Sequence, residues 1–327
     1  QAMWLLLVIA VVMQWLYTFA YGGFFGLLQY SELIRSSIFM VENPLSFLKP
    51  FGGLALFSSF GFWGIWLAKG LRFNIVLGFV LSCGFSLYVL LSWLGRIGFL
   101  VYLATLLLGW LLSLRVRPFF LLSSVVLLMA SILMGAYYIS LWFELKAADS
   151  LLSFLAKELS FPFGSFFAQL AAGEHLFRGF KDFLLAPLFL FPSSWWSSWV
   201  ENVSQVNTAL IMGAPKGEQG VTGGIPVDLL TLGSMQAHVM GIPIVGMMFG
   251  VVLHLIQNML YRLPNPGVQA VFSAYAALKL AVLGVFYAQP ALVVSGNFDF
   301  LISVLIVVVV LRMPRVRWDV PRSSLQK

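Results

Sequence analysis

Charged and titratable side chains gather in one short segment between residues 174 and 182. The segment holds Glu174, His175, Arg178, Lys181 and Asp182. In a helix, Arg178 and Lys181 would share one face, and so would Glu174 and Arg178. The segment is therefore either a solvated helix with local ion pairs or a site where cations hold an anion. Because the apolar residues 183–192 follow directly, the two cations suit a phosphate that is attached to a lipid at a membrane surface.

A glycine-rich segment, residues 217–230 (GEQGVTGGIPVDLL), carries two further acidic side chains, Glu218 and Asp228. Its four glycines are incompatible with a stable helix interior, so an irregular loop is predicted here. Such a backbone can approach a ligand closely and offer N–H groups to an anion. Glycine-rich loops are also common without any such role. The two acids are candidates for a general base.

Three further basic residues are notable by position: Arg35 in the first external loop, Arg96 where the third span ends, and Lys279 inside the seventh span. An ionisable side chain at membrane depth is costly and is a candidate functional residue by default. Arg35 and Arg96 are predicted to support the anion site of Arg178 and Lys181. Arg96 could instead extend to the outer interface, and Lys279 could form a structural ion pair or extend in the same way.

The chain has few histidine and cysteine residues that could bind a metal. The three histidines lack HExxH-type spacing, and Cys83 is the single cysteine. This excludes a disulfide within the chain and a cysteine-based metal site. We predict that the protein uses no metal and no other cofactor.

The composition indicates which solvent surrounds these residues. Hydrophobic residues make up 61% of the chain and charged residues 9%, against roughly 25% charged in soluble domains. Lipid must therefore cover most of the surface. The net charge of +7 does not indicate nucleic-acid binding, because the basic residues lie mostly at the ends of apolar runs.

The apolar runs predict an all-α polytopic membrane protein with about eight transmembrane helices. A helix needs about 20 apolar residues to cross a bilayer. The stretches that qualify are 2–22, 50–68, 73–94, 97–114, 118–141, 230–260, 268–288 and 298–312. The strands of a membrane β-barrel would be about half as long, and apolar and polar residues would alternate along them.

The distribution of charge predicts one orientation. If residue 1 is cytoplasmic, the short cytoplasmic connections and the tail contain Lys69, Arg72, Arg115, Arg117, Arg262, Arg312, Arg315, Arg317, Arg322 and Lys327. Asp319 is the one acidic residue among them, and all other acids fall on the opposite side. This agrees with the positive-inside rule and places the C-terminus in the cytoplasm. The short cytoplasmic turns leave no room for a nucleotide-binding domain, which argues against an ATP-driven pump.

The chain is predicted to have three parts: helices one to five in residues 1–141, a large external loop in 142–228, and helices six to eight with a basic tail in 229–327. Within the loop, 151–159 reads as an interfacial amphipathic helix and 183–192 as a re-entrant or interfacial segment. The tryptophans of SSWWSSW, which follows, suit a membrane interface. The sequence opens with Gln1 on an apolar stretch without a signal peptide, so we expect an N-terminal part to be missing.

The order of these features resembles the oligosaccharide repeat-unit polymerases, the O-antigen polymerase (Wzy) family, with the enterobacterial common antigen polymerase branch nearest in pattern. The resemblance is carried by HLFRGFKDFLLAPLFLFPSSWW, by GVTGGIPVDLL and by the small-residue helix GSMQAHVMGIPIVGMMFGVVLHL. Upstream, ELIRSSIF and LGRIG place arginines where that family also has them. The motifs are loose, although together they cover most of the chain.

The resemblance implies a fold similar to the GT-C-type glycosyltransferases, in a bacterial inner membrane, with the active face periplasmic. Such enzymes transfer a growing glycan from undecaprenyl pyrophosphate to a new lipid-linked repeat unit, without a nucleotide sugar or a metal. A membrane protein that regulates chain length is an expected partner; no nucleic acid is. Cations would stabilise the departing pyrophosphate, Arg178 first and then Lys181, Arg35 and Arg96. The candidates for a base are Asp228 and Glu218, then Glu174 and His175.

Two other functions fit the same residues. A ligase of the O-antigen type would use the same donor but deliver the glycan to the lipid A core. A transporter or flippase of lipid-linked sugars would place its substrate site near the membrane midplane, and Lys279 is the feature that favours it. A purely structural membrane subunit is a further alternative.

Overall fold

The structure, a computed structural model, describes residues 1–36, 43–93, 96–114, 123, 127, 150, 152–153, 163–172, 176–191, 195–196, 199–214, 221, 224–290, 294 and 296–312. Every regular element within these residues is a helix. The elements are α1 (Ala2–Thr18), η1 (Phe19–Tyr21), α2 (Phe24–Ser36), η2 (Ser46–Gly53), α3 (Leu54–Lys69), α4 (Phe73–Trp93), α5 (Arg96–Ser113), α8 (Gly164–Ala172), α9 (Lys181–Leu185), η4 (Ala186–Leu190), α10 (Val203–Met212), α11 (Leu229–Tyr261), α12 (Pro266–Tyr275), η6 (Ala276–Val282), α13 (Leu283–Phe286) and α15 (Phe298–Arg312). The η elements are 3-10 helices, except η6, which is a π-helix.

Five helices in the described part of the chain are long and apolar enough to cross a membrane. They are Ala2–Tyr21, Ser46–Lys69, Phe73–Trp93, Leu229–Tyr261 and Pro266–Phe286. Each coincides with a predicted apolar stretch. In a bilayer the backbone must satisfy its own hydrogen bonds, which is why long apolar runs become helices. We therefore describe the protein as an α-helical membrane protein.

The other three predicted spans have different outcomes. The stretches 97–114 and 298–312 contain shorter apolar helices, Gly98–Ser113 and Phe298–Val310. The stretch 118–141 lies outside the described residues, apart from positions 123 and 127. The total of eight spans stays a prediction.

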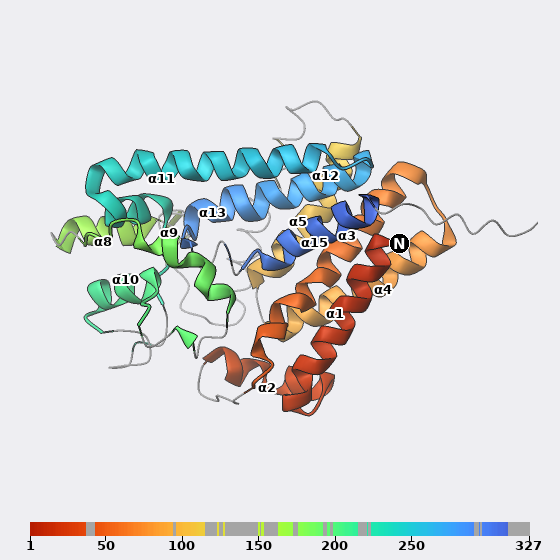
Figure 1. Cartoon of the computed structure of the whole chain (residues 1–327), viewed down its shortest axis with the longest axis horizontal. Helices are drawn as coiled ribbons and strands as arrows, with labels where there is room; N and C mark the ends of the chain where they lie inside the picture. Colours follow the sequence, from red (N-terminus) through yellow and green to blue (C-terminus); the bar gives the residue numbers. More distant parts are fainter. Residues whose placement is uncertain are drawn as a thin grey trace, which may run out of the picture.

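Basic residues mark one end of the helix bundle. In Figure 1 the N-terminus, the α3–α4 turn and the α11–α12 turn all lie toward the right-hand end of the molecule. The two turns carry Lys69, Arg72 and Arg262, all of them exposed. The arrangement brings together side chains that the charge pattern assigns to the cytoplasm.

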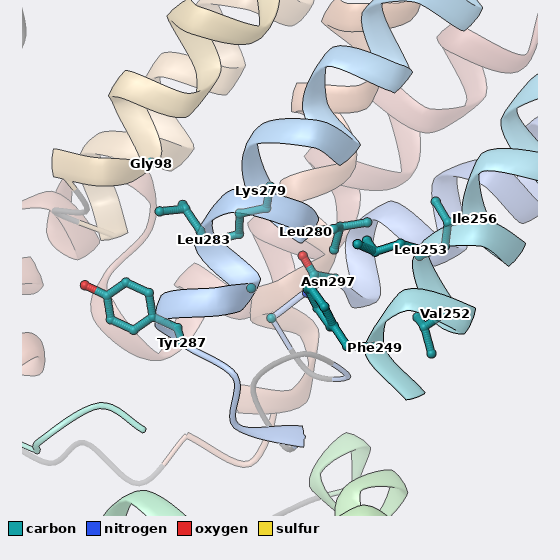
Figure 2. Close-up of a pocket in the computed structure, with 12 residues that line it drawn as sticks. Gly98, Phe249, Val252, Leu253, Ile256, Lys279, Leu280, Leu283, Tyr287 and Asn297 are labelled. Carbon is teal, nitrogen blue, oxygen red and sulfur yellow. The ribbon is translucent and has the colours of Figure 1, made fainter. Parts of the chain in front are cut away.

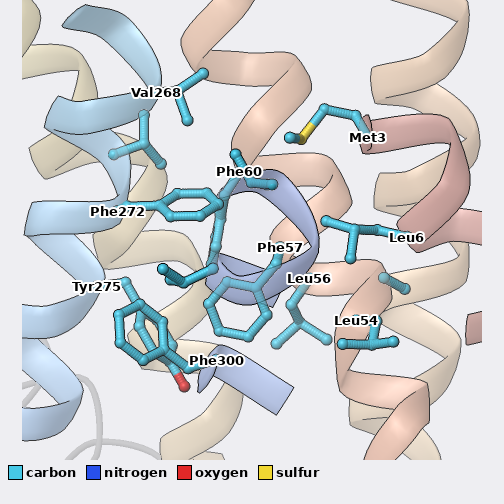
Figure 3. Close-up of a cluster of buried hydrophobic side chains, with 14 of the residues drawn as sticks. Met3, Leu6, Leu54, Leu56, Phe57, Phe60, Val268, Phe272, Tyr275 and Phe300 are labelled. Carbon is cyan, nitrogen blue, oxygen red and sulfur yellow. The ribbon is translucent and has the colours of Figure 1, made fainter. Parts of the chain in front are cut away.

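An aromatic cluster holds the transmembrane helices together, with the fully buried Phe57 of α3 at its centre (Figure 3). Its ring contacts the rings of Phe60, Phe272, Tyr275 and Phe300. The shortest centroid separation is 4.8 Å, to Tyr275, in an edge-to-face arrangement. Such pairs add about 0.5–1.5 kcal/mol each beyond the burial of area. Because Phe272 and Tyr275 belong to α12 and Phe300 to α15, the cluster joins helices that are distant in sequence.

Small residues allow α12 to lie close against α3 and α5. A Cβ atom added at Gly64 would lie 2.5 Å from the backbone nitrogen of Val268, and one added at Gly109 would lie 2.6 Å from a methyl group of Val271. Close approach at glycine is a common basis of helix association in membranes, where burial away from water provides no driving force.

Helix α11 is interrupted near its start, whereas the sequence predicted one unbroken span over 230–260. The backbone leaves helical geometry at Ala237 and His238, and His238 has a left-handed φ of 52°. A Cβ atom added at Gly241 would lie 1.9 Å from the carbonyl oxygen of Gly233. In a straight helix these two residues would be about 12 Å apart along the axis. The short helix 229–236 therefore folds back against the start of the long helix that follows.

The described elements of the external loop gather at the end of the molecule where α11 folds back (Figure 1). Helix α8 packs against α10 and α11. The apolar residues predicted as a re-entrant or interfacial segment form the end of α9 and η4, and Leu184 there is 78% exposed. Of the interfacial helix predicted at 151–159, the structure describes residues 152–153 alone, and both are helical.

Candidate functional site

Arg178 already has a charged partner within the chain. Its Nε and Nη2 atoms donate hydrogen bonds of 2.7 Å to the two carboxylate oxygens of Asp182, four residues later. Nη2 also donates to the carbonyl of Glu201. Arg178 and Asp182 are both buried. A phosphate could reach this guanidinium only in competition with Asp182, whereas the helical spacing had favoured Glu174 as its partner.

Hydrogen bonds join the Arg178–Asp182 pair and its neighbour Gly179 to the residues just before the break in α11. Gln236 donates through Nε2 to Asp182, at 2.8 Å. The backbone N–H groups of Arg178 and Gly179 donate to the carbonyls of Met235 and Gln236. These bonds satisfy carbonyl groups that the end of the short helix leaves free. The ion pair and its neighbours thus hold the folded-back helix in place.

Asp228 is the N-cap of that short helix and is fully buried. Its Oδ1 accepts hydrogen bonds from the backbone N–H groups of Leu230 and Thr231. Its Oδ2 accepts bonds from the hydroxyl groups of Thr231 and Ser165, and Ser165 belongs to α8. The carboxylate was predicted as a general base. In this geometry all its contacts are those of a helix cap that also anchors α8.

The structure relates the predicted site residues only in part. Arg178 and Asp228 lie at opposite ends of the helix 229–236, and Lys181 is exposed at the start of α9. Arg35 and Arg96 lie on α2 and at the start of α5, where the structure describes the backbone alone. The remaining predicted residues, Glu174, His175 and Glu218, lie outside the described residues.

An apolar cavity of about 300 Å³ lies between the loop elements and the transmembrane helices. One wall is formed by Phe183 of α9 and Pro187 of η4, which follow the Arg178–Asp182 pair. The opposite walls come from α11, including Leu232 and Met248, and from α15, including Leu301. The cavity thus lies between residues that follow the predicted cations in sequence and the apolar helices α11 and α15.

A second cavity, of about 310 Å³, adjoins the first, and Lys279 is among the residues that line it (Figure 2). Lys279, Tyr287 and Asn297 provide its polar groups. The residues that line both cavities are Phe249, Val252, Ile256, Leu280 and Asn297. The two cavities are therefore neighbours that share one wall.

The sequence marks Lys279 as an ionisable residue within an apolar run, but does not assign it to the predicted anion site. The structure puts it in the middle of η6, the seven-residue π-helix between α12 and α13. Its charge interacts with that of Asp299, the second residue of α15. Spacing alone could not indicate the cavity, because its walls come from four separate parts of the chain.

Among the described residues, no group of three or more His, Cys, Asp or Glu side chains could hold a metal ion. Comparisons of the chain with protein-family models, with curated proteins and with solved structures give no match.

Proposed function

We propose that the protein is a membrane glycosyltransferase that polymerises undecaprenyl-pyrophosphate-linked oligosaccharide repeat units at the periplasmic face of a bacterial inner membrane. The glycan would be transferred as a block to a new lipid-linked repeat unit, with release of undecaprenyl pyrophosphate.

The observation that carries this proposal is the position of the apolar cavity. A lipid-linked glycan needs apolar space for its isoprenoid chain and polar groups where the sugar begins. The cavity meets the first need, because Phe183 and Leu232 face it from α9 and α11. Lys181 opens α9 and is exposed, so a cation lies two residues from the apolar wall. This juxtaposition suits a substrate whose phosphate lies at the membrane surface.

The chemistry breaks the anomeric C–O bond between the donor glycan and its pyrophosphate. The acceptor hydroxyl oxygen forms the new bond, its proton passes to a base, and the leaving pyrophosphate takes the electron pair. Cations in a dry site stabilise that developing charge. Direct displacement would invert the anomeric configuration. Since Asp228 is engaged as a helix cap, Glu218, Glu174 and His175 are the better candidates for the base.

The test is incubation of the purified full-length protein with undecaprenyl-pyrophosphate-linked repeat units, followed by gel analysis of the glycan. We expect a ladder of repeat lengths without a nucleotide sugar or added metal. A parallel reaction that contains lipid A core tests for ligation. If intact protein and the cognate repeat unit give no ladder, the polymerase proposal is wrong. Glycan on the core would instead favour the ligase.

A second candidate function is transport of the same lipid-linked sugars. The observation in its favour is Lys279, which lines a cavity between apolar helices. Movement of labelled lipid across proteoliposomes, without any change of glycan length, would distinguish transport from polymerisation.

A further inference from the structure

We propose that the two adjoining cavities form one binding site for a polyprenyl lipid that ends in phosphate or pyrophosphate. The isoprenoid chain would occupy the apolar cavity, and the phosphate would lie at the ammonium group of Lys279. The choice of a polyprenyl lipid rests on the proposed function, whereas the cavities and the cation do not.

The two cavities share a wall. Val252 and Ile256 of α11, Leu280 of η6 and Asn297 line both spaces. The lining changes from almost wholly apolar in one cavity to Lys279, Tyr287 and Asn297 in the other. Each volume falls at the lower end of the range for ligand pockets, roughly 300–1,000 Å³. One molecule with an apolar chain and one anionic end therefore matches both cavities together.

The backbone around Lys279 has an unusual conformation, a π-helix. A π-helix is rare, and short π segments inside α-helices occur frequently at functional sites. Here the α-helical geometry of α12 changes at Ala276 and returns at Leu283, with Lys279 in between. Figure 2 shows the Lys279 side chain from this segment at the cavity, across from Leu253 and Ile256 of α11.

No carboxylate among the described residues forms a salt bridge with Lys279. Within the described residues, the salt bridge closer than 4.0 Å is Arg178–Asp182. Asp299 interacts with Lys279 electrostatically, but its Oδ1 accepts a hydrogen bond from the backbone N–H of Phe300. A lysine at membrane depth without a contacting counter-ion is costly. An anionic ligand in the cavity would offset that cost.

The site differs from the one expected from the sequence. By residue type Arg178 is a stronger phosphate ligand than Lys279, but its hydrogen bonds are directed to Asp182. Lys279 interacts electrostatically with Asp299, but within the described residues no salt bridge closer than 4.0 Å joins it to a carboxylate. Because polymerisation requires two lipid-linked substrates, a second cationic position beside the apolar cavity is consistent with the proposed reaction.

Binding is measured with the full-length protein in phosphatidylcholine nanodiscs, with four probes. Radiolabelled undecaprenyl phosphate has both the isoprenoid chain and the phosphate. Undecaprenol has the isoprenoid chain alone, and inorganic pyrophosphate is the anion alone. Phosphatidylglycerol is an anionic lipid with two acyl chains. We expect undecaprenyl phosphate to bind at least about tenfold more tightly than the others, because a hydrogen bond to a charged group distinguishes it from undecaprenol. Equal binding of undecaprenol or of phosphatidylglycerol would overturn the proposal.

Two pairs of variants test the two parts of the site. Lys279→Met should weaken undecaprenyl phosphate binding about tenfold or more, whereas Lys279→Arg, which keeps the charge, should stay within a few-fold of the wild type. Val252→Trp places a larger side chain at the wall that the two cavities share, and should weaken binding to a similar degree. Val251→Trp is its matched control, because Val251 is 59% exposed and lines neither cavity. Monodispersity and thermal unfolding report whether each variant is folded.

The elongation assay separates this proposal from the proposed function. If the wild type binds undecaprenyl phosphate selectively but makes no ladder, the site stands and the polymerase proposal fails. If Lys279→Met binds and elongates like the wild type, the site fails and the polymerase proposal stands.

Discussion

The guanidinium group of Arg178 lies against the carboxylate of Asp182 in a two-point contact, with both hydrogen bonds 2.7 Å long. Both side chains are buried, and Gln236 from the folded-back helix donates to the same carboxylate. The residue that the sequence favoured as a phosphate ligand is therefore also part of the support of a broken helix. The first prediction separates these two roles.

Arg178→Ala should destabilise the protein strongly, because it leaves the Asp182 carboxylate buried without its counter-ion. Removing one partner of a buried pair costs about 3–5 kcal/mol. The double variant Arg178→Met with Asp182→Leu removes both charges and should recover most of that loss. Thermal unfolding in detergent measures both effects.

The elongation assay on the stable double variant then isolates the chemical role. If Arg178 contacts the donor pyrophosphate, the double variant should fold but form no ladder. A normal ladder from the double variant would show that Arg178 acts in the structure alone.

Asp228 permits a similar separation, because asparagine and aspartate are nearly equal as helix N-caps. Asp228→Asn should keep the unfolding temperature close to that of the wild type. Asp228→Ala should lose about 1–2 kcal/mol through the missing cap, since the N–H groups of Leu230 and Thr231 then lack their acceptor. The same thermal unfolding measurement compares the two variants. A folded Asp228→Asn protein that no longer elongates would restore the carboxylate as the general base.

The fold-back of α11 should depend on glycine at position 241. Gly241→Leu places a side chain against the backbone of Gly233, where even a Cβ atom would lie 1.9 Å from the carbonyl oxygen. We expect a loss of about 1–3 kcal/mol or more, because backbone cannot move aside like the end of a side chain. Gly246→Leu is the matched control: it lies on the same helix, and a Cβ atom there meets nothing within 4 Å. Equal unfolding temperatures for the two variants would mean that the contact between Gly233 and Gly241 does not hold the fold-back together.

Membrane orientation can be tested with single cysteines after Cys83→Ala, which removes the chain's one natural cysteine. Arg72→Cys and Arg262→Cys replace exposed residues in the α3–α4 and α11–α12 turns, and Lys181→Cys replaces an exposed residue of the loop. The positive-inside rule predicts that the two turns face the cytoplasm and that the loop faces the opposite side. In intact cells with a permeable outer membrane, an impermeant maleimide should label Lys181→Cys alone. Labelling of the turns would reverse the topology.

The positions of the transmembrane helices followed from the sequence by itself. The predicted stretch 73–94 corresponds to Phe73–Trp93, and 268–288 to Pro266–Phe286. The reason is physical and local, because an apolar run in lipid can satisfy its N–H and C=O groups only as a helix. Charge at the ends of these runs likewise suggested which turns lie together. The sequence also marks Lys279 as an ionisable residue inside an apolar run, although it does not show what surrounds this side chain.

Tertiary structure decided the site. The break at Ala237 and His238 leaves no mark in the hydropathy of the run, because it depends on the contact between Gly233 and Gly241. Asp182 and Gln236 are 54 residues apart, so their hydrogen bond exists only after the loop has packed on α11. The cavity beside Lys279 is formed together with residues of other helices. Spacing along one helix cannot show which helices those are. Local rules predict where a chain becomes helical, but which polar groups meet is decided by packing between distant segments.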